Sequence, residues 1–362
     1  MSFSIPASQS KIVLRQRPEA RVISTLGQGD STFEYVTEKL PSVAEVKDGH
    51  VLIRVEHVSL DPAMRGWLRD ARSYIPPVQI GEVMRAGGVG TVVASKFPGL
   101  QPGDQVSGTL GWQEYAHIPG KACEKRQVAG GSTLLDYLGP LGSSGQTAYW
   151  GIFDVGAIKA NDVVVVTGAA GSVGSLVVQM AKLKGCKVIA VAGSDDKCKW
   201  LKESLKADEA LNYKHADFKK TYREVTQKKY GYIDVVFENV GGEVLDLTLL
   251  CLKPGARIAL CGAIADYNNP KPTGLKNYQT LIAMRAKLQG FIVFDYAKRY
   301  HEAERDISKW LADGSLARKF HVIGDGAKSA KEALQLCPQA LNDLFDGKNV
   351  GKMVVKVAEP LR

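Results

Sequence analysis

The sequence has few cysteines, and none of them is spaced to hold a metal ion or to exchange thiols. No two of the six are separated by the two residues that are typical of structural zinc sites and redox motifs. The six histidines are equally dispersed, and His301-Glu302 lacks the second histidine of the zinc-protease motif HExxH. We therefore expect reduced, mostly buried thiols and no bound metal ion.

Two common catalytic loops are also missing. Gly142-Ser143-Ser144-Gly145 is one residue short of the Gly-x-Ser-x-Gly turn that exposes the nucleophile of many hydrolases. The chain contains no Gly-x-x-x-x-Gly-Lys-Ser/Thr loop, which disfavours a P-loop ATPase. The sequence therefore favours neither serine hydrolysis nor ATP hydrolysis.

The sequence also shows no pattern that indicates a targeting segment or a membrane span. The opening residues, MSFSIPASQS, show no basic stretch followed by an apolar run, so we expect no secretory signal and a cytoplasmic protein. The longest charge-free run, residues 163–181, contains three glycines. We predict that it forms a strand, a turn and a helix rather than a membrane span.

Basic residues outnumber acidic ones by 47 to 38, which gives a net charge of +9. Such an excess suits an anionic partner, for example a nucleic acid or a phosphorylated cofactor. The densest basic stretch, residues 219–229, lies among Asp217 and Glu224. We interpret it as a solvated helix face and expect neither a nucleic acid nor a membrane as partner.

The chain is long enough for two domains, since it has 362 residues, 45% of them hydrophobic. Its first 140 residues alternate short β-like runs with glycine and proline, which indicates a β-rich domain. From about residue 142, strand patterns alternate with helical ones, which is typical of a parallel sheet wrapped by helices. Strands are predicted at 163–166, 187–191, 210–212, 234–237, 257–261, 288–294 and 353–357, and helices at 173–183, 197–205, 218–226, 243–251 and 303–311.

A glycine-spaced turn follows the first of these strands. The run is Val163-Val164-Val165-Val166-Thr167-Gly168-Ala169-Ala170-Gly171-Ser172-Val173-Gly174. Glycines let a backbone turn sharply and approach a pyrophosphate, whose charge is stabilised by the free N–H groups of the following helix. Because Ala169 stands where Gly-x-Gly-x-x-Gly has a glycine, the motif is a variant. Its context predicts dinucleotide binding, with a structural turn as the alternative.

The end of the second strand predicts which dinucleotide binds. An acidic residue there would hold the ribose 2′-hydroxyl of NAD, but this chain has Gly193-Ser194. Glycine leaves room for a 2′-phosphate, and Lys197 supplies a cation one turn further on. Asp195 and Asp196 would either cap the next helix or face solvent, and we favour capping. The sequence therefore predicts NADP(H).

Several motifs in order resemble those of the zinc-independent medium-chain dehydrogenase/reductase superfamily. Within it, the chain is similar to the leukotriene B4 12-hydroxydehydrogenase/prostaglandin reductase family, which includes plant double-bond reductases and bacterial curcumin reductase. The resemblance covers nearly the whole chain. The motifs lie at residues 59–66, 145–151, 168–174, 181–186, 193–197, 212–213, 237–242, 261–264 and 349–352.

The resemblance implies an α/β fold with two domains and a homodimer. A β-rich, GroES-like catalytic domain would be formed by both chain ends, residues 1–141 and 324–362. A Rossmann domain with a doubly wound parallel sheet would bind NADP over residues 142–323. The Rossmann edge strand near residues 288–294 would be the candidate dimer interface.

The resemblance also assigns residues to the cofactor. The pyrophosphate would be held by Gly171, Ser172, Val173 and Gly174, and the 2′-phosphate by Lys197 and Tyr213. The rest of the cofactor and its nicotinamide would be lined by Asn239, Cys261, Gly262, Ala263, Ile264, Phe291, Ile292, Val293 and Asn349.

The implied reaction is the NADPH-dependent reduction of the C=C bond of α,β-unsaturated ketones and aldehydes. Without a metal to polarise a carbonyl, hydride addition to the β-carbon is the more natural chemistry. Charge would gather on the carbonyl oxygen, and Tyr267 is the implied hydrogen-bond donor that stabilises it. A plain loop aromatic is the alternative for Tyr267.

The implied substrate pocket contains Ala63, Met64 and Tyr74. Ala63 stands where many relatives have tyrosine, so we expect a larger pocket that admits bulkier enones. Core packing is the alternative for Met64, and packing against the neighbouring prolines is the alternative for Tyr74.

Two other functions fit the same sequence. A zinc-free NADPH:quinone reductase would share the fold and the cofactor. A non-catalytic relative that binds NADPH or RNA would keep the glycine turn without turnover.

Overall fold

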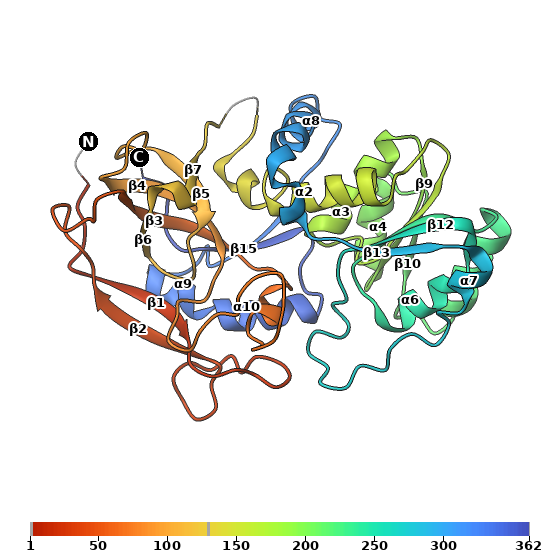
Figure 1. Cartoon of the computed structure of the whole chain (residues 1–362), viewed down its shortest axis with the longest axis horizontal. Coiled ribbons are helices and arrows are strands. Elements are labelled where there is room, and N and C mark those ends of the chain that lie inside the picture. Colours follow the sequence, from red (N-terminus) through yellow and green to blue (C-terminus); the bar gives the residue numbers. More distant parts are fainter. Residues whose placement is uncertain (1–2, 129–130, 362) are drawn as a thin grey trace. The chain divides into compact units, whose positions relative to one another are not determined.

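The computed structural model describes residues 3–128 and 131–361 and divides the chain into two compact units (Figure 1). Unit 1 consists of Met1–Leu138 and Phe320–Arg362, and unit 2 of Gly139–Lys319. Both chain ends therefore belong to one unit, and the whole of the other unit lies between them in the sequence.

Unit 1 is built on mostly antiparallel strands. Strands β1 (Ser8–Leu14) and β2 (Phe33–Lys39) pair with each other. A larger sheet has the order β14-β15-β3-β4-β5-β7, and β6 also pairs with β3. Its strands are β3 (His50–Ser59), β4 (Gly87–Ser95), β5 (Gln105–Thr109), β6 (Tyr115–Pro119), β7 (Cys123–Lys125), β14 (Phe320–Ile323) and β15 (Lys352–Lys356).

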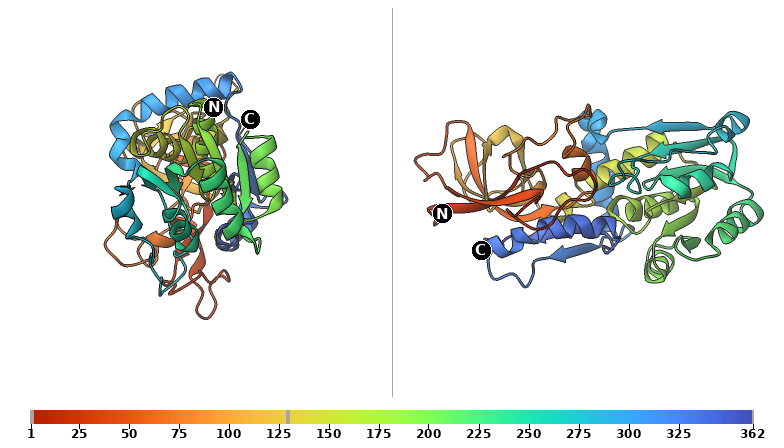
Figure 2. Two further views of the ribbon diagram at one scale, coloured as in Figure 1. Left: turned by 90° about the vertical axis from the view of Figure 1, so that its right-hand side faces the viewer. Right: turned by 90° about the horizontal axis from the view of Figure 1, so that it is seen from below.

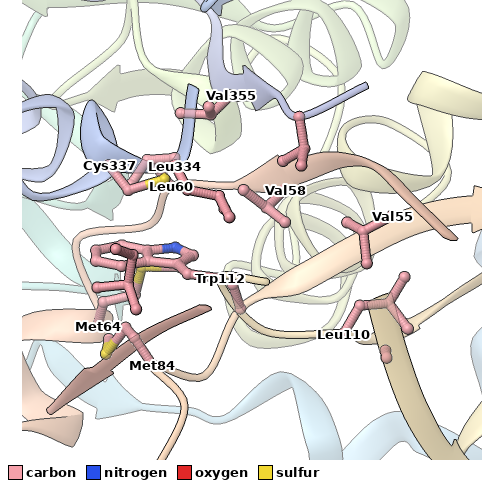
Figure 3. Close-up of a cluster of buried hydrophobic side chains, with 14 of the residues drawn as sticks. Val55, Val58, Leu60, Met64, Met84, Leu110, Trp112, Leu334, Cys337 and Val355 are labelled. Carbon is pink, nitrogen blue, oxygen red and sulfur yellow. The ribbon is translucent and has the colours of Figure 1, made fainter. Parts of the chain in front are cut away.

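The core of unit 1 joins these strands to short helices. Trp112 and Met84 pack there with apolar side chains of β3, as the close-up of this cluster shows (Figure 3). Leu334 and Cys337, from the C-terminal part of the chain, belong to the same cluster. The α-helices of this unit are α1 (Met64–Trp67), α9 (Ala330–Gln335) and α10 (Cys337–Phe345).

The return to unit 1 begins earlier than the sequence indicated. Residues 320–323, assigned above to the Rossmann domain, form β14, which pairs in parallel with β15. A four-residue strand gives too weak a pattern to reveal which sheet it joins. Pairing with β15 places it in unit 1, so the boundary lies at Lys319 rather than at residue 323.

Unit 2 is a six-stranded parallel sheet with the order β10-β9-β8-β11-β12-β13. Numbered along the chain, this is the order 3-2-1-4-5-6 of a Rossmann sheet, as predicted. All four residues of β8 are buried, as expected for a strand covered on both faces. The strands are β8 (Val163–Val166), β9 (Lys187–Ala192), β10 (Glu209–Asn212), β11 (Ile233–Glu238), β12 (Leu252–Leu260) and β13 (Lys287–Gly290).

Helices lie on both faces of this sheet (Figure 2). The α-helices are α2 (Ser143–Trp150), α3 (Ser172–Leu183), α4 (Asp195–Glu203), α5 (Phe218–Arg223), α6 (Gly242–Leu249), α7 (Thr280–Met284) and α8 (Tyr300–Ala312). A 3₁₀ segment, η5, covers Val293–Arg299. No helix among the described residues is both long and apolar enough to cross a membrane.

Two local predictions in unit 2 were wrong. The strand expected at 288–294 ends at Gly290, because its neighbour β12 ends at the paired residue Leu260 and offers no further ladder partner. The chain then passes into η5 at Val293. The strand expected at 257–261 begins earlier, at Leu252, so that Pro254 and Gly255 lie inside β12, where the pairing with β11 shifts register. A register irregularity accommodates residues that weaken a regular strand.

Candidate cofactor site

The strand order of unit 2 locates its binding edge. In open parallel sheets, ligands bind outside the carboxyl ends of the two strands where the chain order reverses. In this sheet those strands are β8 and β11, which pair with each other. The turns that follow them, residues 167–174 and 239–242, and the turn at 261–264 after β12 therefore form the candidate site.

The turn at 167–174, here called the glycine turn, requires glycine at its last position. A Cβ on Gly174 would overlap the carbonyl oxygen of Gly168 and would lie 2.8 Å from the Cα of Ala169. Gly171 is the N-cap of α3, and as a glycine it offers no side chain to the first N–H groups of the helix. These N–H groups can therefore bind an anion, as predicted for a pyrophosphate. Ala169 is fully buried, so the variant position faces the protein interior.

The residues after β9 surround the predicted 2′-phosphate position. A Cβ on Gly193 would lie 3.1 Å from the Tyr213 hydroxyl oxygen, so the tyrosine ring lies directly against this glycine. Lys197 is half-buried in the first turn of α4. Burial and the nearby positive charge of Lys214 both lower the pKa of its amino group. Two cations held close together in this way favour a bound anion, since the anion relieves their repulsion.

Capping by Asp195 or Asp196 was the wrong interpretation. The N-cap of α4 is Ser194, whose extended backbone lets its Oγ accept the N–H of Lys197 at 3.3 Å. Asp195 instead accepts a hydrogen bond from Asn212 Nδ2 at 3.0 Å and lies 2.8 Å from His215 Nε2. These hydrogen bonds lower the pKa of the Asp195 carboxyl. Its carboxylate is thus held by β10 and the residues after it.

Residues after β11 and β12 meet at the predicted nicotinamide end. Asn239 Nδ2 donates to the carbonyl oxygen of Thr167 at 2.7 Å, which ties the turn after β11 to the glycine turn. The Tyr267 hydroxyl accepts the N–H of Ala263 at 3.2 Å, so the 261–264 turn holds it in place. Gly262 leaves room for this contact, because a Cβ there would lie 3.1 Å from the same hydroxyl oxygen.

The remaining predicted cofactor residues of unit 2 lie near these turns. Burial raises the pKa of the Cys261 thiol to about 12, so the thiol is neutral and cannot act as a nucleophile. Phe291 packs edge-on against Phe237, with ring centroids 6.2 Å apart, in space left by Gly151. The carbonyl oxygen of Val293 accepts the Tyr300 hydroxyl at 3.0 Å, while Ile292 is the extended N-cap of η5. Ile264 donates its N–H to the carbonyl oxygen of Asn239 at 3.1 Å.

The predicted residues of unit 1 have different environments. Asn349 is buried, and its Nδ2 donates to the carbonyl oxygen of Gly351 at 2.8 Å. Tyr74 is 46% exposed, and its hydroxyl accepts Trp67 Nε1 at 3.0 Å. Ala63 is part-buried at the start of α1.

Met64 does not fit the predicted substrate pocket. Its side chain is fully buried and packs in the core of unit 1 with Trp112 and Met84 (Figure 3). A side chain with no exposed surface packs the core rather than contacting a substrate, so the core-packing alternative holds for this residue.

Sequence reasoning missed two buried polar residues of the site. Thr167 Oγ1 donates to Glu238 Oε1 at 2.7 Å and accepts the N–H of Asn239 at 2.8 Å. The available signal was positional, since Thr167 directly follows β8 and Glu238 ends β11. Polar residues at the carboxyl ends of the two central strands of a Rossmann sheet lie where ligands bind.

The geometry of unit 2 defines a class of protein. A parallel sheet of Rossmann order, a glycine turn leading into a helix, and a half-buried lysine in the first turn of the helix after Gly193 are the parts of a site for a phosphorylated dinucleotide. Among the described residues, no group of three histidine, cysteine, aspartate or glutamate side chains is placed to hold a metal ion. The class is therefore that of the dinucleotide-dependent oxidoreductases.

Comparisons with known proteins identify the family. Residues 11–126 match the N-terminal domain of oxidoreductases, and residues 172–311 match the domain described as zinc-binding dehydrogenase. An NADPH-dependent curcumin reductase of Escherichia coli is 38% identical over 95% of this chain and 98% of its own length. An NADP-dependent 2-alkenal reductase of Nicotiana tabacum is 35% identical over 91% and 93%. CurA of Vibrio vulnificus, solved with NADPH, is 38% identical with a TM-score of 0.86 over 97% of this chain and 100% of its own.

The chain belongs to the zinc-independent medium-chain dehydrogenase/reductase family, and its relatives there include curcumin, prostaglandin and alkenal reductases. Its cofactor is NADP(H), in agreement with the prediction from Gly193 and Lys197. The fold class predicted from the sequence is likewise confirmed.

Proposed function

We propose that this protein reduces the C=C bond of α,β-unsaturated ketones and aldehydes, with the hydride added to the β-carbon. The observation that carries the proposal is the Tyr267 hydroxyl, held at the turn after β12 by the N–H of Ala263. A hydrogen-bond donor at this place suits a reaction in which negative charge develops on a carbonyl oxygen. The curcumin and 2-alkenal reductases among the relatives support the same substrate class.

The chain's own residues have three tasks in this mechanism. NADPH, when bound, supplies the hydride. The glycine turn and Lys197 bind its phosphates, and the residues of the 261–264 turn orient its nicotinamide. Tyr267 donates a hydrogen bond to the carbonyl oxygen as its negative charge increases, and Tyr267 or water then delivers a proton to the α-carbon. Hydride and proton together account for the two hydrogens of the saturated product.

Tyr267→Phe tests the assigned donor. Losing a single donor to a developing oxyanion costs on the order of a hundredfold in turnover. We expect kcat to fall by about that factor with little change in NADPH affinity, measured by fluorescence titration. Tyr278→Phe is the matched control, because Tyr278 is 56% exposed and outside the site. Unchanged turnover in Tyr267→Phe would remove this residue from the mechanism.

The reaction class is tested by following NADPH oxidation with different acceptors. A linear enal, an aryl enone, a bulky dienone and a benzoquinone would each be assayed with NADPH and with NADH. The proposal predicts enone-dependent oxidation of NADPH and a product saturated at the former C=C bond. Quinone activity that exceeds enone activity by orders of magnitude would instead indicate a quinone reductase. No activity with any acceptor, despite tight NADPH binding, would indicate a non-catalytic relative.

Two residues of unit 1 stay in the proposal as substrate contacts. Ala63 offers only a methyl group, and Tyr74 is exposed with its hydroxyl held by Trp67. We expect a preference for bulkier enones over small ones within the same acceptor series.

We also propose a homodimer that forms along the edge of the sheet in unit 2. Within the described residues, β13 pairs only with β12. Large apolar side chains are exposed nearby, with Ile282 77% and Phe294 51% exposed. Such a patch beside an unpaired strand edge favours association.

Ile282→Glu tests this interface. A charge in an apolar contact between copies would dissociate them, so we expect the mass from light scattering to fall from twice 39.2 kDa to the monomer value. Val43→Glu places the same charge on an exposed residue of unit 1 and should leave the mass unchanged. A wild-type protein that is monomeric at assay concentration would refute the proposal.

A further inference from the structure

Glu238, the last residue of β11, is fully buried, and a single oxygen of its carboxyl group binds several donors. Its Oε1 accepts hydrogen bonds from Thr167 Oγ1 at 2.7 Å, from the N–H of Val240 at 2.5 Å and from the N–H of Gly241 at 2.7 Å. Two successive backbone N–H groups that converge on one oxygen form a small anion-binding nest. The anion in this nest is the protein's own carboxylate.

The second carboxyl oxygen of Glu238 has no such support. Oε2 is buried and has no hydrogen-bond partner among the described residues. Burial raises the pKa of the Glu238 carboxyl to about 6, although the three hydrogen bonds to Oε1 oppose the shift. The charge of Glu238 acts on two other titratable groups, the Cys261 thiol directly after β12 and the Tyr222 phenol on α5. Burial raises the pKa of each, so both are neutral and neither compensates the carboxylate charge.

Glu238 connects all three turns of the cofactor site. Its carboxyl group binds the hydroxyl of Thr167, the first residue of the glycine turn. The same hydroxyl accepts the N–H of Asn239, which lies in the turn after β11. Its backbone carbonyl accepts the N–H groups of Cys261 and Gly262 at 2.9 and 3.1 Å, which fixes the start of the 261–264 turn.

The turn after β11 depends on this anchor for conformational reasons. Gly241 and Gly242 have φ of 74° and 54°, in the left-handed region. Glycine enters this region without a steric cost, but it also has many other conformations available. The bonds from Val240 and Gly241 to the carboxylate select one of them.

We propose that Glu238 is a positioning residue for NADP(H), which in its ionised form holds Asn239 and the neighbouring turns in the geometry that binds the nicotinamide half of the cofactor. Hydrogen bonds to an ionised acceptor are about twice as strong as neutral ones, so protonation of the carboxyl loosens the 239–242 turn. Cofactor affinity therefore falls as the pH falls through about 6. The inference rests on the cofactor and is independent of the substrate.

The test measures cofactor binding without any acceptor substrate. NADPH carries a 2′-phosphate whose own pKa is also near 6, as for other phosphate monoesters. NADH lacks this phosphate, so its dissociation constant, titrated by fluorescence between pH 5 and pH 8, reports the protein groups. For the wild-type protein we expect the affinity for NADH to fall about tenfold from pH 8 to pH 5, with a midpoint near 6.

Three variants separate positioning from a purely structural role. Glu238→Gln is neutral at every pH, so we expect about tenfold weaker NADH binding at pH 8 and no midpoint near 6. Glu238→Asp keeps a carboxylate and should retain a midpoint. Glu243→Gln is the matched control, because that carboxylate is exposed at the start of α6 and should leave the whole profile unchanged.

Two results for the Glu238→Gln variant would overturn the proposal. One is a Glu238→Gln profile that follows the wild type at every pH, and another is uniformly weaker binding that keeps the midpoint. If Glu238→Gln does not fold, amide hydrogen exchange of Val240 and Gly241 in the wild type decides. We expect their protection to fall about tenfold from pH 8 to pH 5 after correction for intrinsic exchange, and constant protection would refute the role.

Discussion

Gly174→Ala is expected to weaken NADPH binding about a hundredfold while the protein stays folded. The added methyl group would overlap the Gly168 carbonyl oxygen and lie 3.0 Å from the carbonyl carbon of the same residue. Both atoms are backbone, so the conflict can be relieved only by moving the glycine turn away from the start of α3. The pyrophosphate would then lose the N–H groups that bind its charge.

Fluorescence titration with NADPH measures this loss, and thermal unfolding shows whether the fold persists. Alanine is favoured over glycine within helices by roughly 1 kcal/mol, which offsets part of the strain in α3. Gly66→Ala is the control, since a Cβ at that helical glycine would meet nothing within 4 Å. Wild-type affinity in Gly174→Ala would mean that the pyrophosphate is not bound at this turn.

Lys197→Ala is expected to raise the Michaelis constant for NADPH by about ten- to a hundredfold and to leave that for NADH almost unchanged. The range follows from the roughly 1.5–3 kcal/mol of a hydrogen bond to a charged group. The lysine is half-buried beside Lys214, and NADH lacks the 2′-phosphate that both cations would neutralise. Removing the charge of Lys197 therefore weakens the binding of NADPH and not that of NADH.

Steady-state kinetics with both cofactors check this prediction. Lys199→Ala serves as the control, because Lys199 is exposed on the same helix. If the two Michaelis constants rise by the same factor, Lys197 supports α4 or the fold and does not select the cofactor.

Regular patterns made most of unit 2 predictable. The valine run of β8 and the glycine turn after it follow from local sequence, and the parallel sheet follows from alternating strands and helices. Gly193 and Lys197 were sufficient to predict the cofactor, because a 2′-phosphate needs space and a cation.

Features that depend on distant partners were harder to predict. The end of β13 is set by the length of its neighbour β12, and the N-cap of α4 by the extended backbone of Ser194. The apolar side chain of Met64 suits a hydrophobic core as well as a substrate pocket, so the sequence alone does not distinguish the two. The role of Glu238 became visible only when β8 and β11 were placed side by side.

The division of unit 1 between both ends of the chain constrains the order of folding during synthesis. The end of strand β3, His57–Ser59, pairs with β15, which follows all of unit 2 in the sequence and is therefore synthesised after it. Residues 139–319 form a separate unit whose strands are contiguous in the sequence, so this unit can complete its sheet first. Until β15 has been synthesised, the His57–Ser59 end of β3 lacks this partner and stays open to pairing with other chains, whereas His50–Arg54 already pairs with β6. Nascent chains are therefore prone to aggregate through the part of unit 1 that is synthesised first, and premature termination within residues 320–351 would leave this end of β3 permanently exposed.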